Sequence, residues 1–300
     1  MYSQIKKVCL LCVASIALIG VSQAQEKQKP EHDMKTQAHH RLLSDVLGAD
    51  VRMKASDEAI REAREDNEQP DRPAGTIEDL LIDSRSKKVE WVVISFGGLI
   101  GIGDKTVAVP VKMVDWNQAK KCFDLSATEE QLEKQKEFDL DEAKESGFDS
   151  AVKAVQSSWV ALGIPEQNYQ EQDREKAKII EGTTFTIVPM RLSAASEIAD
   201  LPVYAKAKEW GEIEKAFFDV KSMRVAAVVV EGDEHQFLVP FDALHHARDK
   251  GERALVIEKT PEELKGCTTY EEPKSGLVDP AALKRSREFF GLPESSTFGF

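Results

Sequence analysis

The chain has 300 residues, a hydrophobic content of 41% and a formal net charge of −13. This acidity disfavours nucleic-acid binding, which needs a concentrated basic patch, and it disfavours binding to anionic lipids through charge. With this length and hydrophobic content, the chain can bury two small cores more readily than one large core.

The first 24 residues have the pattern of a signal peptide. Lys6-Lys7 precedes an apolar run over 8–21, and Ser22-Gln23-Ala24 fits a small-x-small cleavage site. The apolar run has only about 14 residues, which is short for a spanning helix, although a retained anchor is the alternative. We therefore expect an exported protein, periplasmic or extracellular, with no integral membrane anchor after cleavage. The polar stretch 25–38 predicts a disordered lead.

One stretch of the sequence occurs twice. Residues 75–110 return in a trimmed form at 211–240, and the shortening lies in the Gly-rich segment after Ile94. The equivalent pairs are Gly75 with Gly211, Ile77 with Ile213, Glu78 with Glu214, Asp83 with Asp219, Val89 with Val225 and Pro110 with Pro240. The chain therefore contains a duplicated module.

Within each copy, the pattern predicts a small closed sheet. Polar turn formers over 83–88 separate two apolar runs, which indicates a hairpin. The run Val89–Ile94 is continuously apolar, as expected of a strand covered on both faces. After it, Gly97-Gly98 permits a sharp bend, and Pro110 stands where ladder pairing stops. Short strands of this kind remove their exposed edges by closing into a barrel.

These residues resemble the PRC-barrel family. The order G-x-I-E-D-L-L-I-D, x-V-x-x-V-V-I, G-G-L-I-G-I-G-D-K and V-A-V-P over 75–110 is similar to the domain found in the photosynthetic reaction-centre H subunit and in a ribosome-maturation factor. Residues 41–51 resemble the first strand region of the family, and residues 190–193 and 198–204 do so for the second copy. The resemblance implies the barrel fold and an adaptor-like role, and it carries no catalytic motif.

We therefore predict a mainly β protein with added helices, in which two small PRC-like β-barrels are joined by a helical linker. The expected segments are a signal peptide at 1–24, a disordered lead at 25–38, barrel one at 39–126 with an insert at 56–74, a helical linker at 127–182, barrel two at 183–259 and a helical tail at 260–300.

Helix signals fall between and after the barrels. Thr128 and Thr260 each precede acidic residues, as an N-cap does at the start of a helix. Phe148–Leu162 carries apolar residues at steps of three and four, which predicts an amphipathic helix that packs on a barrel or, alternatively, docks a partner. We also expect helices at 171–180 and 280–290.

The Gly-rich hairpin at 97–105 is the strongest candidate contact site. It does not fit a phosphate loop, because Asp104 stands where such a loop needs lysine and because it joins two strands. Its apolar tip, formed by Leu99, Ile100 and Ile102, is instead a candidate partner contact.

Histidine and cysteine give weaker signals. The pairs His39-His40 and His245-His246 lack the spacing of metal ligands, so we interpret them as structural or surface residues. Cys122 and Cys267 follow the first and second barrel and either pair as a disulfide or remain two thiols.

No nucleophile lies in a strained turn of the G-x-S-x-G type, so we expect neither an enzyme nor a cofactor. The sequence favours an exported, non-catalytic interaction or scaffold module of the cell envelope, with an unknown protein partner that a membrane complex could supply. The alternative is a periplasmic protein that binds a small ligand or a metal.

Overall fold

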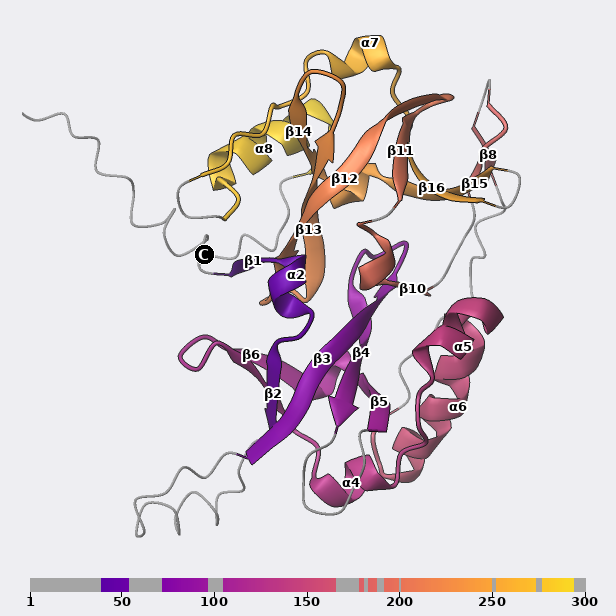
Figure 1. The fold of residues 1–300 in the computed structure, drawn as a ribbon, viewed down its shortest axis with the longest axis vertical. Coiled ribbons are helices and arrows are strands. Elements are labelled where there is room, and N and C mark those ends of the chain that lie inside the picture. The colour runs from indigo at the N-terminus through magenta and orange to yellow at the C-terminus, as the bar shows by residue number, and fades with distance from the viewer. Residues whose placement is uncertain are drawn as a thin grey trace, which may run out of the picture.

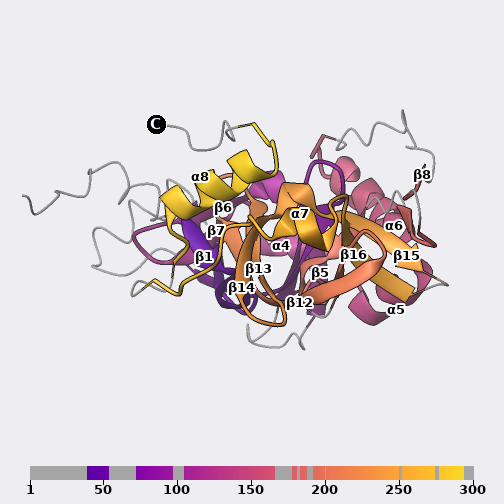
Figure 2. The same ribbon diagram turned by 90° about the horizontal axis from the view of Figure 1, so that it is seen from above.

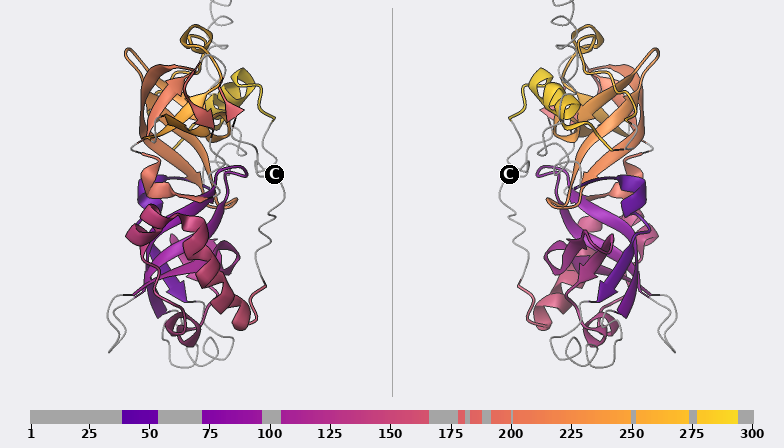
Figure 3. Two further views of the ribbon diagram at one scale, coloured as in Figure 1. Left: turned by 90° about the vertical axis from the view of Figure 1, so that its right-hand side faces the viewer. Right: turned by 90° about the vertical axis from the view of Figure 1, so that its left-hand side faces the viewer.

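Two β-barrels stand one above the other, with barrel one below and barrel two above (Figures 1 and 3). The computed structural model describes residues 39–53, 72–96, 105–165, 178–180, 183–187, 192–199, 201–249, 252–273 and 277–293. The signal segment, the disordered lead, most of the insert and the hairpin tip at 97–104 lie outside these ranges. In the described part, no helix is both long and apolar enough to cross a membrane.

Barrel one is a curled sheet in the order β5-β4-β3-β2-β7-β6. Its strands are β2 (Asp50–Met53), β3 (Arg72–Asp83), β4 (Val89–Phe96), β5 (Lys105–Pro110), β6 (Val114–Asn117) and β7 (Cys122–Leu125). A single 3-10 turn, η1 (Val111–Met113), separates β5 from β6. Strands β2 and β7 pair in parallel, and the other neighbours on this path are antiparallel.

Barrel two repeats this topology. Its sheet runs β14-β13-β12-β11-β16-β15, and the short strands β9 and β8 extend it beyond β15. The strands are β8 (Lys178–Ile179), β9 (Thr186–Ile187), β11 (Pro202–Ala205), β12 (Lys208–Asp219), β13 (Arg224–Glu231), β14 (Gln236–Pro240), β15 (His245–Asp249) and β16 (Glu252–Ile257), with η3 (Phe241–Ala243) after β14. The parallel pair is again the same one, β11 with β16. The protein is therefore mainly β, with two barrels of one design, as the sequence predicts.

Details of the long strands also repeat. The β3–β4 register shifts at Glu78 and the β12–β13 register shifts at Glu214, so both copies carry a bulge at the same position. A Cβ on Gly75 would lie 1.9 Å from the carbonyl oxygen of Ser95, and one on Gly211 would meet a strand carbonyl at 2.1 Å. Glycine is required at both sites because the neighbouring backbone leaves no room for a side chain.

The two barrels exchange their first strands. Strand β1 (His40–Leu42) precedes barrel one but pairs antiparallel with Phe217–Asp219 of β12. Strand β10 (Leu192–Ala194) comes before β11 of barrel two but pairs with Leu81–Asp83 of β3. The short α2 (Leu43–Val46) and η2 (Ala195–Glu197) then lead each chain segment back to its own barrel. Each copy therefore completes the sheet of the other.

An approximate two-fold axis relates the copies at their contact. The turns before β4 and β13 meet there, and Lys88 forms an isolated antiparallel bridge with its own counterpart, Arg224. The amide of Val89 donates to the carbonyl of Met223 at 2.8 Å, which continues the pairing across the junction. One continuous hydrophobic core contains residues of both barrels. The barrels therefore form one packed unit and not two domains on a flexible linker.

Helices cover the outside of the barrels. The helices are α4 (Glu129–Glu133), α5 (Leu140–Ser146) and α6 (Phe148–Ala161) beside barrel one, and α7 (Pro261–Leu264) and α8 (Pro280–Phe289) over barrel two (Figures 1 and 2). The predicted caps are confirmed, since Thr128 and Thr260 both form capping boxes. The α6 prediction is confirmed too: Trp159 is buried and its indole nitrogen donates to Ala108 of β5 at 2.9 Å. The helix expected at 171–180 is wrong at its end, because Lys178–Ile179 forms strand β8.

Candidate functional site at the junction of the barrels

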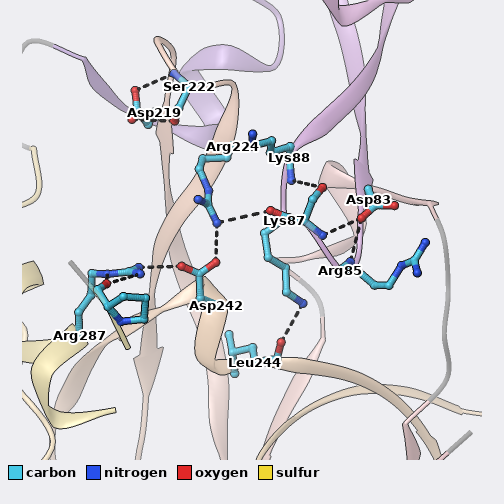
Figure 4. A network of polar contacts seen from close by, with 12 residues as sticks. Asp83, Arg85, Lys87, Lys88, Asp219, Ser222, Arg224, Asp242, Leu244 and Arg287 are labelled. Atoms are coloured by element: carbon cyan, nitrogen blue, oxygen red, sulfur yellow. Dashed lines mark hydrogen bonds and ion pairs between the residues drawn. The ribbon is translucent and has the colours of Figure 1, made fainter. Parts of the chain in front are cut away.

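A partly buried carboxylate, that of Asp242, joins three elements of the second copy next to the contact between the barrels. Asp242 of η3 accepts hydrogen bonds from Arg224 of β13 at 2.5 Å and from Arg287 of α8 at 2.7 Å (Figure 4). The same Arg224 nitrogen lies 3.5 Å from the carbonyl oxygen of Ser86, in the β3–β4 turn of barrel one. Arg287 also donates to the carbonyl oxygen of Pro293, which closes the C-terminal end of α8. Charge-assisted bonds of this kind are short and directional, so they fix the angle between the elements.

A lysine crosses from barrel one into barrel two. Lys87 follows the β3 turn and is only 7% exposed. Its ammonium group donates to the carbonyl oxygen of Leu244 at 2.9 Å and lies 5.3 Å from the ring centre of Phe241 (Figure 4). The carbonyl and the aromatic face replace part of the hydration that the buried ammonium loses.

A second carboxylate holds one of the exchanged segments. Asp79 of β3 is fully buried and accepts from the Ser196 hydroxyl at 2.5 Å, the Ser196 amide at 3.1 Å and the Leu80 amide at 2.7 Å. Burial raises the pKa of Asp79, although the hydrogen bonds from Ser196 and Leu80 act in the opposite direction. Asp79 thereby fastens η2 of the second copy to barrel one.

The histidine pairs each place one ring in the interior. His40 is 2% exposed and His246 is 4% exposed. Loss of hydration on burial and, to a smaller extent, the neighbouring charges of Lys87, Arg253 and His245 together lower the pKa of His246 to about 3. In the ranges described, no group of three or more His, Cys, Asp and Glu side chains could hold a metal ion.

The remaining predicted site residues do not gather at this junction. Leu99, Ile100 and Ile102 lie outside the described residues. Cys122 on β7 and Cys267 after α7 are both buried free thiols, so the disulfide that we considered is absent. Burial raises the pKa of both, to about 12 for Cys267.

Sequence reasoning missed Lys87, Arg224 and Asp242. The alignment of the two copies contains one signal, and it points to Asp242. Because Pro110 matches Pro240, Asp242 stands where the first copy has Lys112. A reversal of charge between equivalent positions indicates a contact that only one copy makes.

The comparison with known families agrees with the repeated topology. Residues 67–123 and 190–264 match the family model described as the PRC-barrel domain. No curated protein matches the chain.

Proposed function

Because the chain carries two PRC-barrel domains in tandem, we propose that it is an exported, non-catalytic interaction or scaffold module of the cell envelope. Its partner is another protein, either free or part of a membrane complex. The family match favours this class of function, since PRC-barrel domains bring no catalytic motif to transfer, and the pattern of the first 24 residues favours export.

The exchange of first strands is the observation that carries the proposal. Strands β1 and β10 each add to the sheet of the other barrel, and Lys87 and Arg224 each donate a hydrogen bond from one barrel to the other. A scaffold needs surfaces held at a fixed distance and angle. Two barrels that share a core and exchange strands meet this need, whereas two barrels on a loose linker would not.

The partner contact that we propose is the hairpin tip with Leu99, Ile100 and Ile102. Strand β4 begins at the junction with Val89, and it runs away from barrel two to Phe96. The end of β4, where the described residues stop before this segment, therefore lies at the end of barrel one remote from barrel two (Figure 1). A partner bound there would not cover the inter-barrel contact.

The test is a cross-linked pull-down of the mature protein, beginning at Gln25, from its own envelope fraction. Three baits are compared: the parent, the double variant Leu99→Ser/Ile100→Ser, and Val160→Ser as a control. Val160 is the one large hydrophobic residue exposed in the described part, at 44%, so the control makes the same chemical change away from the hairpin. One protein recovered by the parent and the control, but lost with the double variant, supports the proposal. Equal recovery by all three baits refutes it.

Export is tested separately. We expect the protein in the periplasmic or extracellular fraction, with an intact mass that matches a chain whose first residue is Gln25. A full-length chain in the cytoplasmic fraction would contradict the export part and leave the pull-down to decide the interaction part.

A further inference from the structure

Two arginines face each other across the β15–β16 pair. Arg248 is the direct partner of Arg253, and His246 is the direct partner of Leu255, in a register without a bulge. Direct partners point to the same face of a sheet, and so do residues two apart along one strand. Arg253 and His246 therefore lie on one face as diagonal neighbours, which long side chains can bridge.

Arg253 uses only one edge of its guanidinium group. Its Nη1 donates to Glu197 of η2 at 2.5 Å. Its Nε and Nη2 atoms are buried and have no hydrogen-bond partner in the part of the chain described here. These two atoms form the other edge of the group, where two parallel N–H bonds match the two oxygens of a carboxylate or an inorganic oxyanion.

His246 provides a third buried nitrogen, Nε2, without a hydrogen-bond partner among the described residues. Buried polar groups in native proteins are nearly always hydrogen-bonded, so three such atoms on neighbouring side chains of one face call for an explanation. An acceptor shared by Arg253 and His246 would satisfy all three.

The charges around these atoms favour an anion. Lys87 from barrel one, Arg253 from β16 and His245 from β15 are the groups whose charges act on His246, and Arg248 lies opposite Arg253. Glu197 is the carboxylate that pairs with Arg253. In a chain of net charge −13, this face therefore concentrates positive charge.

We propose that Arg253 and His246 bind a small oxyanion, a carboxylate or an inorganic oxyanion, on the barrel-two side of the junction. The Nε and Nη2 atoms of Arg253 donate to two of its oxygens, and His246 donates from Nε2 when it is protonated. Arg253 keeps 23% of its side chain exposed, so the ligand reaches the site from solvent through a movement of this side chain. The site is independent of the proposed hairpin contact.

Binding of the anion and protonation of His246 favour each other. Lys87, Arg253 and His245 oppose a positive charge on His246, and Glu197 is already paired with Arg253. An oxyanion supplies the missing negative partner, so the affinity rises as pH falls from 7.5 to 5.5. We expect a gain of about tenfold, which is the gain that follows when the bound anion returns the pKa of His246 from about 3 to its ordinary value of 6.5.

The experiment is a calorimetric titration of the full mature chain with sodium acetate, sodium sulfate or sodium chloride at constant ionic strength, at pH 7.5 and pH 5.5. Binding of acetate without binding of sulfate identifies a carboxylate site, and binding of sulfate identifies a site for inorganic oxyanions. The variants are Arg253→Lys, which keeps a cation for Glu197 but lacks the paired donors, and His246→Gln. Arg285→Lys makes the same change at an exposed position of α8 and is the control.

The expected result is saturable binding of acetate or sulfate to the parent and to Arg285→Lys, and at least a tenfold loss with Arg253→Lys. His246→Gln should bind without the gain at pH 5.5. The proposal is overturned if no oxyanion binds saturably, or if Arg253→Lys binds as the parent does. Should Arg253→Lys fail to fold, His246→Gln decides, because a pH gain that persists without the imidazole also overturns the proposal. The hairpin variant Leu99→Ser/Ile100→Ser should bind the anion normally.

Discussion

His246 should make the protein sensitive to mild acid. The ring is 4% exposed, and burial with the charges of Lys87, Arg253 and His245 lowers its pKa from 6.5 to about 3. The unfolded chain, in contrast, takes up a proton at His246 near pH 6.5. Between these two values the unfolded state binds one more proton at this site than the folded state.

The sign and size of the effect follow from this difference. Stability decreases as pH decreases wherever the unfolded state binds more protons, so the contribution of neutral His246 is complete above pH 6.5 and is lost as pH falls toward 3. Each pH unit corresponds to about 1.4 kcal/mol, so at pH 5.0 the free energy of unfolding should be lower by about 2 kcal/mol. This is a sizeable share of the roughly 5–15 kcal/mol that stabilises a domain.

Urea unfolding of the parent and His246→Gln at pH 7.5 and 5.0 measures the effect. Buffers free of small carboxylates, phosphate and sulfate are required, because an oxyanion bound at the junction would oppose the loss. The variant should lose about 2 kcal/mol less than the parent over this range. His235→Gln, an exposed histidine in the β13–β14 turn, is the control and should behave as the parent. Equal losses for the parent and His246→Gln would refute the reasoning.

Three further changes test the packing. Gly75→Ala should lower the free energy of unfolding by roughly 2–4 kcal/mol, because the new Cβ would meet the Ser95 carbonyl oxygen at 1.9 Å. Gly48→Ala should cost only about 1 kcal/mol, because its Cβ meets open space and only the φ of +86° is unfavourable. Chemical denaturation compares the two variants. Asp242→Asn should cost roughly 1.5–3 kcal/mol, since its two arginine partners lose charge-assisted hydrogen bonds to a partly buried carboxylate, and a single unfolding transition of both barrels that moves with the variant would confirm the coupling. Cys267, with a pKa raised to about 12, should react with a thiol reagent at pH 8 at least about a hundredfold more slowly in the native than in the unfolded protein; a native rate equal to the unfolded rate would contradict its burial.

The sequence allowed the module to be predicted because its determinants are local. Gly75 and Gly211 stand where the backbones approach closely, and Pro110 and Pro240 end their strands before a 3-10 turn. Capping residues such as Thr128 act within four residues of themselves. Each of these features repeats with the copy, so the duplication itself makes the prediction firmer.

The strand exchange could not be predicted in this way. The residues of β1 and β10 satisfy the same β pattern whether they pair within their own copy or with the other copy. Periodicity gives the face that a strand buries, and it does not give the partner strand. The partner strand is instead determined by tertiary contacts at the junction, where Lys88 forms a bridge with Arg224. The end of the helix expected at 171–180 was wrong for a related reason, since Lys178 pairs with Ile187 at the edge of barrel two and tertiary pairing overrides helix propensity there.

The contacts that distinguish the two copies have a common origin. At two equivalent positions the charge is reversed: Asp79 corresponds to Lys215, and Lys112 corresponds to Asp242. Asp79 is buried and binds Ser196 across the junction, and Asp242 is partly buried and binds Arg224, which contacts Ser86 of barrel one, whereas Lys215 pairs with Glu272 near the surface.

A symmetric pair of barrels would repeat every contact on both sides of the axis. In the described part, this chain instead has contacts that differ between the two sides of the axis. Asp79 binds Ser196, Lys87 donates to Leu244, and two nitrogens of Arg253 have no hydrogen-bond partner. The asymmetry gives barrel two a polar, charge-rich face at the junction, while the longer Gly-rich segment after Ile94 belongs to the sequence of barrel one. Because the exchanged strands make the two barrels one packed unit, a change in the packing of either end alters the stability of the whole. A partner bound at the proposed hairpin contact and an anion bound at Arg253 would therefore stabilise the same folded state, although they bind at separate sites.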